Sequence, residues 1–305
     1  MTPCLLIAGP TAAGKTALSL AAAEILGGEI INADSMQIYD GLALITAQPD
    51  ADERARVPHH LFGTIDPATR YSVGQWTSDV LALIAGCRDR GRVPILVGGT
   101  GLYFNALIRG LAEVPEIGAA ARSRTAALLE AAGLSGLRAE ALRRDPVAAQ
   151  RVKAADRQRL MRIVEVAFET GRALSDFQAD TVAPLAASEW RGLVIEPDRE
   201  ALYARIEHRF DRMLEAGALD EVAAFAARGL DPTLPASKAL GVPQLMAYLR
   251  GELSRAEAVE LAKRDSRRYA KRQSTWFRNQ TGSWPRIRSL DPVQARSALA
   301  DLLDT

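Results

Sequence analysis

A glycine-rich segment near the N-terminus constrains this chain more than any other feature. Residues 9–16 read Gly-Pro-Thr-Ala-Ala-Gly-Lys-Thr and match the phosphate-loop pattern GxxxxGK[ST]. The apolar run Cys4–Ala8 precedes the loop and the helix-forming segment Ala17–Leu26 follows it, which is the strand–loop–helix context of this motif. Such a loop turns backbone N–H groups inward and binds phosphate or diphosphate. The alternative interpretation is a chance glycine-rich turn.

The last two residues of the motif carry its chemistry. The ammonium group of Lys15 is placed to reach terminal phosphates, and the hydroxyl of Thr16 is a ligand for Mg²⁺. The other members of the predicted diphosphate-binding loop are Gly9, Pro10, Thr11, Ala12, Ala13 and Gly14. The motif indicates a phosphate-containing ligand and does not identify that ligand as ATP.

Apolar runs alternate with helical segments through the first hundred residues. We expect strands at Cys4–Ala8, Glu29–Asn32, His60–Ile65 and Val93–Val97, with helices at 15–26 and 73–90. Continuous apolar strands separated by helices predict an α/β fold, with a parallel sheet covered on both faces. Ligands of such sheets bind beyond the carboxyl ends of the strands, where the phosphate loop lies.

The pattern changes after Pro115. Residues 119–179 contain no β-type run, and helical periodicity at 119–132, 136–143, 146–153 and 157–171 predicts an all-helical insertion. Strand character returns at Gly192–Glu196, followed by helices at 198–216, 218–228 and 254–280 and a short strand and helix after Arg286. We therefore expect a P-loop core in two parts, 1–114 and 186–305, with the insertion at 115–185 and basic helices near the C-terminus.

Basic residues are concentrated in two tracts, although the formal net charge is only +1. Lys263–Arg288 contains nine Lys or Arg against one acid, and Arg143–Arg172 contains eight against four. This segregation indicates a polyanionic partner that touches two places. The alternative is two solvated helix faces.

Several classes of protein are disfavoured by the remaining composition. Cys4 and Cys87 match no disulfide or metal spacing, so both are expected to be core thiols, and the three histidines show no ligand pattern. No apolar run is long enough to span a bilayer, and the N-terminus lacks a basic region with a cleavage site. We expect a cytosolic protein.

Two further loops carry polar groups to the same edge of the predicted sheet. The second strand leads to Asp34, a residue able to bind Mg²⁺ through water or to accept a proton; capping of the following helix is the alternative. The strand Pro94–Val97 ends in Gly-Gly-Thr-Gly, where an ordinary P-loop nucleotidase has a metal-binding Asp. These glycines favour close approach of a bulky ligand and weaken an ATPase interpretation.

Taken together, these segments resemble the successive signatures of bacterial tRNA dimethylallyltransferases (tRNA isopentenyltransferases). The resemblance is carried by the phosphate loop, Asp-Ser-Met-Gln-Ile-Tyr from Asp34, Val-Pro-His-His-Leu, Val-Gly-Gly-Thr-Gly-Leu-Tyr, Asp-Arg-Gln-Arg-Leu from Asp156, the segment from Arg205 to Arg209, and Lys-Arg-Gln-Ser-Thr-Trp-Phe-Arg from Lys271. The signatures cover nearly the entire chain in family order. The segment Ala239–Gln244 matches less closely.

The resemblance implies a reaction and a set of catalytic residues. A dimethylallyl group would pass from dimethylallyl diphosphate to the exocyclic amine of adenosine 37, beside the tRNA anticodon, with Mg²⁺ as cofactor. Asp34 would be the base, Thr100 would hold the amine or a phosphate oxygen, and Lys15 and Arg209 would stabilise the diphosphate. The alternative for Arg209 is an ion pair on the helix surface, near Glu207. We expect a monomer.

The resemblance also implies that the insertion grips the anticodon stem-loop. The residues expected to contact tRNA are Asp34, Ser35, Met36, Gln37, Thr100, Arg122, Gln158, Arg159, Leu160, Met161, Arg162, Lys271, Arg272, Gln273, Trp276 and Arg278. Core packing is the alternative for Trp276 and its neighbour Phe277, and an exposed helix face is the alternative for Gln158 and Arg159.

Two other functions stay open on the sequence. A small-molecule or nucleoside kinase would explain the phosphate loop and Asp34, but not the basic tracts or the insertion. A non-catalytic RNA-binding switch with a nucleotide effector would explain the basic tracts. It would leave Asp34 and the Gly-Gly-Thr-Gly loop without a role.

Overall fold

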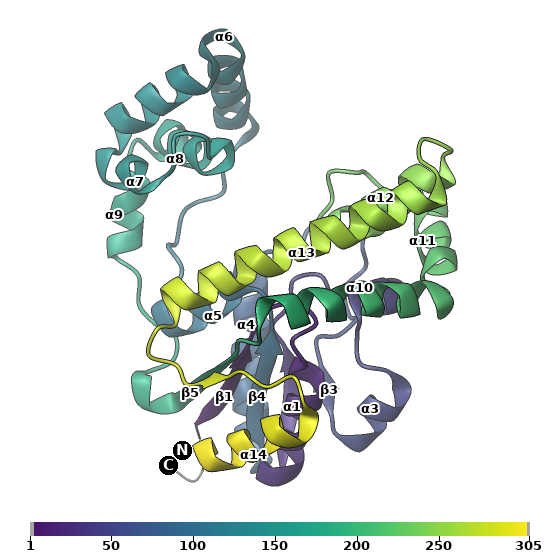
Figure 1. The fold of residues 1–305 in the computed structure, drawn as a ribbon. Coiled ribbons are helices and arrows are strands. Elements are labelled where there is room, and N and C mark those ends of the chain that lie inside the picture. Colours follow the sequence, from purple (N-terminus) through teal and green to yellow (C-terminus); the bar gives the residue numbers. More distant parts are fainter. Residues whose placement is uncertain (1–2, 304–305) are drawn as a thin grey trace. The chain divides into compact units, whose positions relative to one another are not determined.

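The computed structural model describes residues 3–303 of the chain (Figure 1). They form two compact units. The described parts of Met1–Ile108 and Leu185–Thr305 make the first unit, and Arg109–Pro184 makes the second. The sequence suggested an insertion over 115–185, and in the structure the second unit begins earlier, where helix α5 (Gly101–Arg109) ends.

The first unit is built on a six-stranded sheet. Its strands lie in the order β3 (His59–His60), β2 (Gly28–Asn32), β4 (Val93–Gly98), β1 (Cys4–Ala8), β5 (Trp190–Ile195) and β6 (Arg286–Ile287), and each neighbouring pair is parallel. Ala8 at the end of β1 lies opposite Gly98 and Val194. The loops that follow these strands therefore meet at one edge, and the predicted α/β fold is confirmed.

Side chains of the central strands alternate between two hydrophobic layers. Leu6 and Leu96 point to the layer that contains α4 (Val73–Asp89), α5, α11 (Ala218–Ala227) and α12 (Val242–Leu249). Leu5 and Ile95 point to the opposite layer, which contains α1 (Lys15–Leu26) and α14 (Pro292–Leu303). Helices α10 (Arg199–Glu215) and α13 (Arg255–Gln280) contribute to both layers. Coverage of both faces explains the unbroken apolar character of these strands.

Local signals define the starts of α4 and α13, two of the helices predicted in this unit. Ser72 begins α4 and Ser254 begins α13, and each forms a capping box with the residue three positions later. Helix α13 ends at Gln280, and the N–H of Thr281 bonds to the carbonyl of Phe277.

The second unit is entirely helical over Ala119–Ala179. It contains α6 (Ala119–Arg144), α7 (Pro146–Arg151), α8 (Arg157–Thr170) and α9 (Leu174–Ala179). Gly133, with a φ of 63°, interrupts the helical backbone of α6, which agrees with the two helices expected at 119–132 and 136–143. Leu137, Leu160 and Ile163 lie in the hydrophobic core of the second unit.

The structure corrects several predicted elements. The strand expected at His60–Ile65 is only His59–His60, because Leu61 and Gly63 take positive φ angles and turn the chain; Ile65 then forms an isolated bridge with Tyr39. Short helices went unpredicted: α2 (Ala43–Thr46), α3 (Ala51–Arg56), α5, α9 and α12. None of the helices within residues 3–303 combines the length and apolar character that crossing a membrane needs.

Candidate functional site: a phosphate-loop pocket

The phosphate loop forms the turn between β1 and α1. Ala12 and Gly14 both lie in the left-handed region, with φ angles of 63° and 90°. Alternation of handedness turns successive N–H groups toward one side, which creates an anion-binding concavity. Nζ of Lys15 donates to the carbonyl of Pro10 at 2.8 Å. Burial lowers the pKa of Lys15 to about 8, opposed by the negative charge of Asp34.

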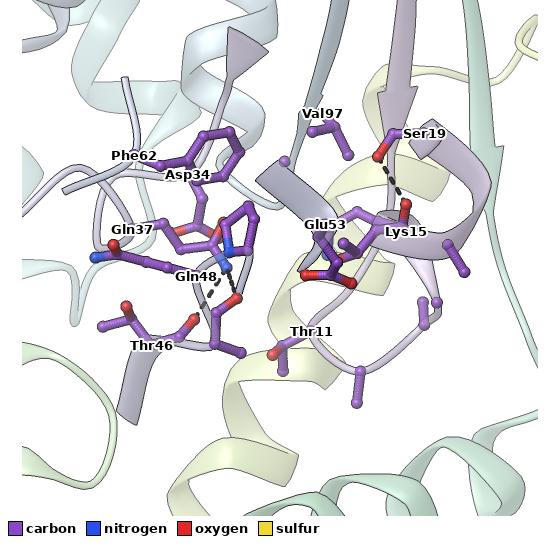
Figure 2. A pocket seen from close by; sticks show the side chains of 18 of the residues that line it. Thr11, Lys15, Ser19, Asp34, Gln37, Thr46, Gln48, Glu53, Phe62 and Val97 are labelled. Atoms are coloured by element: carbon purple, nitrogen blue, oxygen red, sulfur yellow. Dashed lines mark hydrogen bonds between the residues drawn. The ribbon is translucent and has the colours of Figure 1, made fainter. Parts of the chain in front are cut away.

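A cavity of about 340 Å³ opens beside this loop. Figure 2 shows Thr11 and Lys15 on one side of it, with Asp34 and Gln37 on the other. Nε2 of Gln37 donates to two carbonyls of the next loop, those of Thr46 at 2.9 Å and Ala47 at 2.6 Å. The structure thus brings the predicted loop and the predicted carboxylate to one pocket.

Asn32 fixes the loop that carries Asp34. Its Oδ1 accepts from the N–H of Asp34 at 2.8 Å, and its Nδ2 donates to the carbonyls of Asp34 and Leu61. The backbone of Asn32 is held in turn by the indole of Trp76, which donates to its carbonyl at 2.9 Å. Sequence reasoning missed Asn32 and Trp76. The available signal was a polar residue at the end of the strand, directly after Ile30 and Ile31.

Asp34 itself forms a local turn. Its Oδ1 accepts from the N–H of Met36 at 3.0 Å, an Asx-type contact two residues along the chain. The next helix does not begin until Ala43, so the helix-capping alternative for Asp34 is wrong.

Thr100 lies directly beside this turn. Its Oγ1 accepts from the N–H of Ser35 at 2.9 Å and donates to Oγ of Ser35 at 3.3 Å. Burial, assisted by the charge of Asp34, raises the pKa of Tyr269, so its phenol keeps its proton. The two bonds between Thr100 and Ser35 thus connect the loop after β4 to the turn that carries the predicted base.

Arg209 reaches the pocket from α10. Its guanidinium donates to Oγ1 of Thr11, and burial lowers its pKa to about 10, opposed by the charge of Asp34. Glu207 pairs instead with Arg267, so the surface ion pair considered for Arg209 is absent from the described interactions.

A second cavity, of about 280 Å³, lies on the other side of Asp34 and Arg209. Both residues line this cavity as well as the phosphate-loop cavity. Its remaining lining combines apolar or aromatic side chains, such as Met36, Ile45, Phe210, Met213, Leu240 and Tyr269, with polar or charged ones, such as Ser35, Lys238, Ser266 and Arg272. Asp34 and Arg209 therefore lie between an anion-binding space and a second space whose lining is partly apolar.

The glycines after β4 serve the packing of the chain itself. A Cβ on Gly98 would lie 1.9 Å from the carbonyl oxygen of Ala33, and one on Gly99 would lie 2.2 Å from Nε2 of Gln273. A Cβ on Gly101 would lie 2.3 Å from the ring of Trp276. The expectation that these glycines admit a bulky ligand is therefore wrong, because the chain already fills the space.

Two of the residues expected to contact tRNA are buried. Leu160 is fully buried in the core of the second unit. Gln273 is 5% exposed, and its amide bonds to the backbone of Thr11 and Gly99. For these two residues a direct contact with tRNA is a wrong prediction, since their side chains are occupied within the protein.

The other predicted tRNA residues are exposed or half-buried. Arg122, Gln158, Arg159 and Arg162 are exposed and Met161 is half-buried on the second unit, while Lys271, Arg272 and Arg278 are exposed on α13. Trp276 is half-buried against Phe277 at 5.1 Å between ring centroids, and Phe277 is buried. The core-packing alternative is confirmed for Phe277.

Acids from other segments neutralise much of the C-terminal basic tract. Lys263 pairs with Asp211 at 2.6 Å, and Arg278 with Glu196 at 3.0 Å. Within residues 3–303, Lys271 and Arg272 have no acidic partner, and Arg272 lies over the ring of Tyr269 at 5.5 Å. Fewer basic residues of this tract are therefore available to bind a polyanion than the sequence count indicates.

The segment from Gln48 to Phe62, which includes β3, supplies pocket residues that sequence reasoning missed. Gln48, Glu53, His59 and Phe62 all line the phosphate-loop cavity. Nδ1 of His59 lies 2.9 Å from the carbonyl of Val57. The motif Val-Pro-His-His-Leu lies in this segment. The segment has no helical or strand periodicity, so its position beside the phosphate loop could not be predicted.

A cluster of possible metal ligands lies elsewhere in the first unit. Ligand atoms of Glu29, His60 and Cys87 come within 4.8 Å of one another. Hydrogen bonds from Arg90 hold the pKa of Glu29 at about 2, and the guanidinium lies 2.7 Å from its carboxylate. Because that cation already neutralises Glu29, the cluster is an ion-paired structural group.

Comparison with known proteins shows the family to which this chain belongs. Residues 37–280 match the family model described as IPP transferase. The chain belongs to this family. It is 79% identical over 304 residues to a tRNA dimethylallyltransferase of Maricaulis maris, covering 100% of this chain and 99% of that one. It is 53% identical over 286 residues to a tRNA dimethylallyltransferase of Phenylobacterium zucineum, covering 94% and 92% of the two chains.

Solved structures of the family share the fold. A tRNA isopentenylpyrophosphate transferase from Bacillus halodurans is 34% identical, with a TM-score of 0.69 and coverage of 100% of this chain and 97% of that one. A eukaryotic dimethylallyltransferase acting on tRNA is 26% identical, with a TM-score of 0.80 and coverage of 94% and 74%. The resemblance seen in the sequence motifs is thus confirmed at the level of the family.

Proposed function

We propose that this protein transfers a dimethylallyl group from dimethylallyl diphosphate to the exocyclic amine of adenosine 37, adjacent to the anticodon of tRNA. One observation carries the proposal. Asp34 and Arg209 line both the phosphate-loop cavity and the adjoining cavity, whose lining is partly apolar. A carboxylate there can meet a nucleophile while the neighbouring cations hold a diphosphate. Family membership supports the same reaction.

The departing diphosphate is held by the phosphate loop. N–H groups at the start of α1, with Lys15 and Arg209, stabilise the charge that develops when the carbon–oxygen bond of the allylic diphosphate breaks. Lys15 is oriented toward Pro10 in this structure, so binding of diphosphate exchanges that carbonyl for a phosphate oxygen.

Asp34 takes the proton that the amine loses. A bond forms between the amine nitrogen and the allylic carbon, diphosphate leaves, and the proton passes from nitrogen to the carboxylate. The turn made by Asn32 and Met36 fixes the carboxylate before the substrate arrives. General-base catalysis of this kind contributes a factor of about 10²–10⁴.

The pocket offers oxygen ligands that suit Mg²⁺. Thr16, Asp34 and Glu53 line it, and hard cations prefer such oxygens together with phosphate and water. Thr16 would hold the ion, which when bound would supply further neutralisation of the diphosphate.

The acceptor tRNA is proposed to contact exposed cations on both units. Arg122, Arg159 and Arg162 carry charge on the second unit, and Lys271 and Arg272 carry it on α13. Cations supply phosphate contacts, whereas exposed amides such as Gln158 suit base edges. Every proposed catalytic group comes from one chain, so a monomer suffices.

The decisive test combines purified protein, Mg²⁺, radiolabelled dimethylallyl diphosphate and unmodified tRNA. We expect label in tRNA without any requirement for ATP, and no transfer to tRNA in which adenosine 37 is replaced. Hydrolysis of ATP stimulated by tRNA, without labelling of the tRNA, would reject the proposal in favour of a nucleotide-driven function.

A further inference from the structure

The amide of Gln273 joins helix α13 to two loops of the site. Oε1 of Gln273 accepts from the N–H of Thr11 at 2.9 Å. Nε2 donates to the carbonyl of Gly99, also at 2.9 Å. The side chain is 5% exposed, so neither bond is open to free competition from water. One buried side chain thus connects the phosphate loop with the loop after β4.

Both ends of this amide are needed. Thr11 presents a donor and Gly99 an acceptor, and an uncharged amide supplies the matching acceptor and donor together, which an ionised carboxylate of the same length does not. Gly99 is part of the same arrangement, because a Cβ there would lie 2.2 Å from Nε2 of Gln273.

The phosphate loop needs such a constraint. Ala12, the residue after Thr11, has a φ of 63°, and a left-handed conformation is unfavourable for an L-residue other than Gly. Strained backbone of this kind persists only where surrounding structure fixes it. Gln273 holds the backbone of Thr11, and Arg209 holds its hydroxyl.

We propose that Gln273 is a positioning residue, which keeps the phosphate loop in its anion-binding conformation and in register with the loop that carries Thr100. It acts through the backbone of Thr11 and Gly99 and touches neither the diphosphate nor tRNA. The identity of the anion as the diphosphate of a prenyl donor rests on the proposed function, but the constraint on the loop does not.

The test is Gln273→Glu, which preserves the size of the side chain. An ionised carboxylate still accepts from Thr11 but faces the carbonyl of Gly99 with no proton to donate. A protonated carboxyl restores that donor, and burial favours the protonated form. Relative to the unmodified protein, affinity for inorganic pyrophosphate with Mg²⁺ should fall at least tenfold near pH 8.5 and recover substantially near pH 6, as measured by titration calorimetry.

Gln294→Glu is the matched control. Gln294 is exposed on α14, and its Oε1 accepts from the hydroxyl of Ser289, a bond that a carboxylate retains. This variant introduces the same charge, so its pyrophosphate affinity relative to the unmodified protein should be independent of pH. Gln273→Met, which fills the space without either bond, should bind pyrophosphate weakly at every pH and serves if the Glu variant does not fold.

The tRNA affinity of the Gln273 variants, measured without donor, should stay within about twofold of the unmodified protein. Unchanged pyrophosphate affinity at both pH values would overturn the inference, as would loss of tRNA affinity with pyrophosphate binding intact. If the unmodified protein binds pyrophosphate but transfers no prenyl group, the proposed function fails while this inference is still tested by the same binding data.

Discussion

The buried side-chain amide of Asn32 positions Asp34 in the pocket. That side chain bonds the N–H and the carbonyl of Asp34, and Met36 donates to the carboxylate. The carboxylate is therefore oriented before any ligand binds, which reduces the reorganisation that catalysis requires.

Asp34→Asn should lower the single-turnover rate of prenyl transfer by about 100-fold or more, because the amide keeps the shape but cannot accept a proton. Affinity for tRNA should change little. Asp40→Asn is the control: Asp40 is exposed, and its Oδ1 bonds the N–H of Gly41. A near-normal rate for Asp34→Asn would assign Asp34 a purely structural role.

Lys15 predicts a pH dependence of anion binding. Burial lowers its folded-state pKa to about 8, below its ordinary value of 10.5, so the lysine is charged below about pH 8 and becomes neutral above it. Affinity for pyrophosphate should therefore fall as the pH rises through this value. The Lys15→Gln variant is the control, because its pH dependence reports the ionisation of pyrophosphate without that of Lys15. Parallel pH profiles of the two proteins in calorimetric titrations would contradict the prediction.

At the scale of elements, α13 has two chemically distinct faces. Gln273 and Phe277 face inward, whereas Lys271 and Arg272 are exposed. The period of the helix separates these roles over a short sequence, which explains why Lys-Arg-Gln-Ser-Thr-Trp-Phe-Arg combines charged and packing residues.

Arg272→Ala should weaken binding of every tRNA similarly. If the guanidinium contacts a phosphate in a loop, the slope of log K against log salt concentration should become shallower by about 0.7. Arg250→Ala removes the same charge from an arginine that pairs with Glu252 and should leave the slope unchanged. Fluorescence titrations at several salt concentrations provide the measurement. Equal slopes for Arg272→Ala and the unmodified protein would show that this part of α13 is a solvated face that does not contact tRNA.

At the scale of the whole molecule, each unit has its own hydrophobic core. The two layers around the sheet belong to the first unit, and Leu137, Leu160 and Ile163 belong to the second. The phosphate-loop cavity is lined only by residues of the first unit. Stability of the second unit and binding of diphosphate should therefore be separable.

Leu137→Ala should destabilise the second unit by about 2–5 kcal/mol, since it removes a fully buried side chain. Pyrophosphate affinity should stay the same. Hydrogen exchange of each unit and calorimetry provide the two measurements. Val147→Ala, at a position 48% exposed in the same unit, should have little effect. A fall in pyrophosphate affinity for Leu137→Ala would show that the units are coupled.

The sequence by itself determined the parts of this protein that depend on local chemistry. The phosphate loop, the apolar strands around it and the capped helices could all be predicted, because turn geometry, periodicity and capping act over a few residues. The parallel sheet followed from the alternation of strands and helices, and it correctly placed Asp34 beside Lys15.

Tertiary structure alone decided which side chains face the ligand and which face the chain. Gln273, Thr11 and Gly99 are distant in sequence, and no local pattern marks their contact. The glycines after β4 looked like space for a ligand, yet Ala33, Gln273 and Trp276 fill that space. Likewise, the nine basic residues of Lys263–Arg288 are partly neutralised by acids such as Asp211 and Glu196. Such pairings depend on how distant segments pack, which spacing along the chain does not encode.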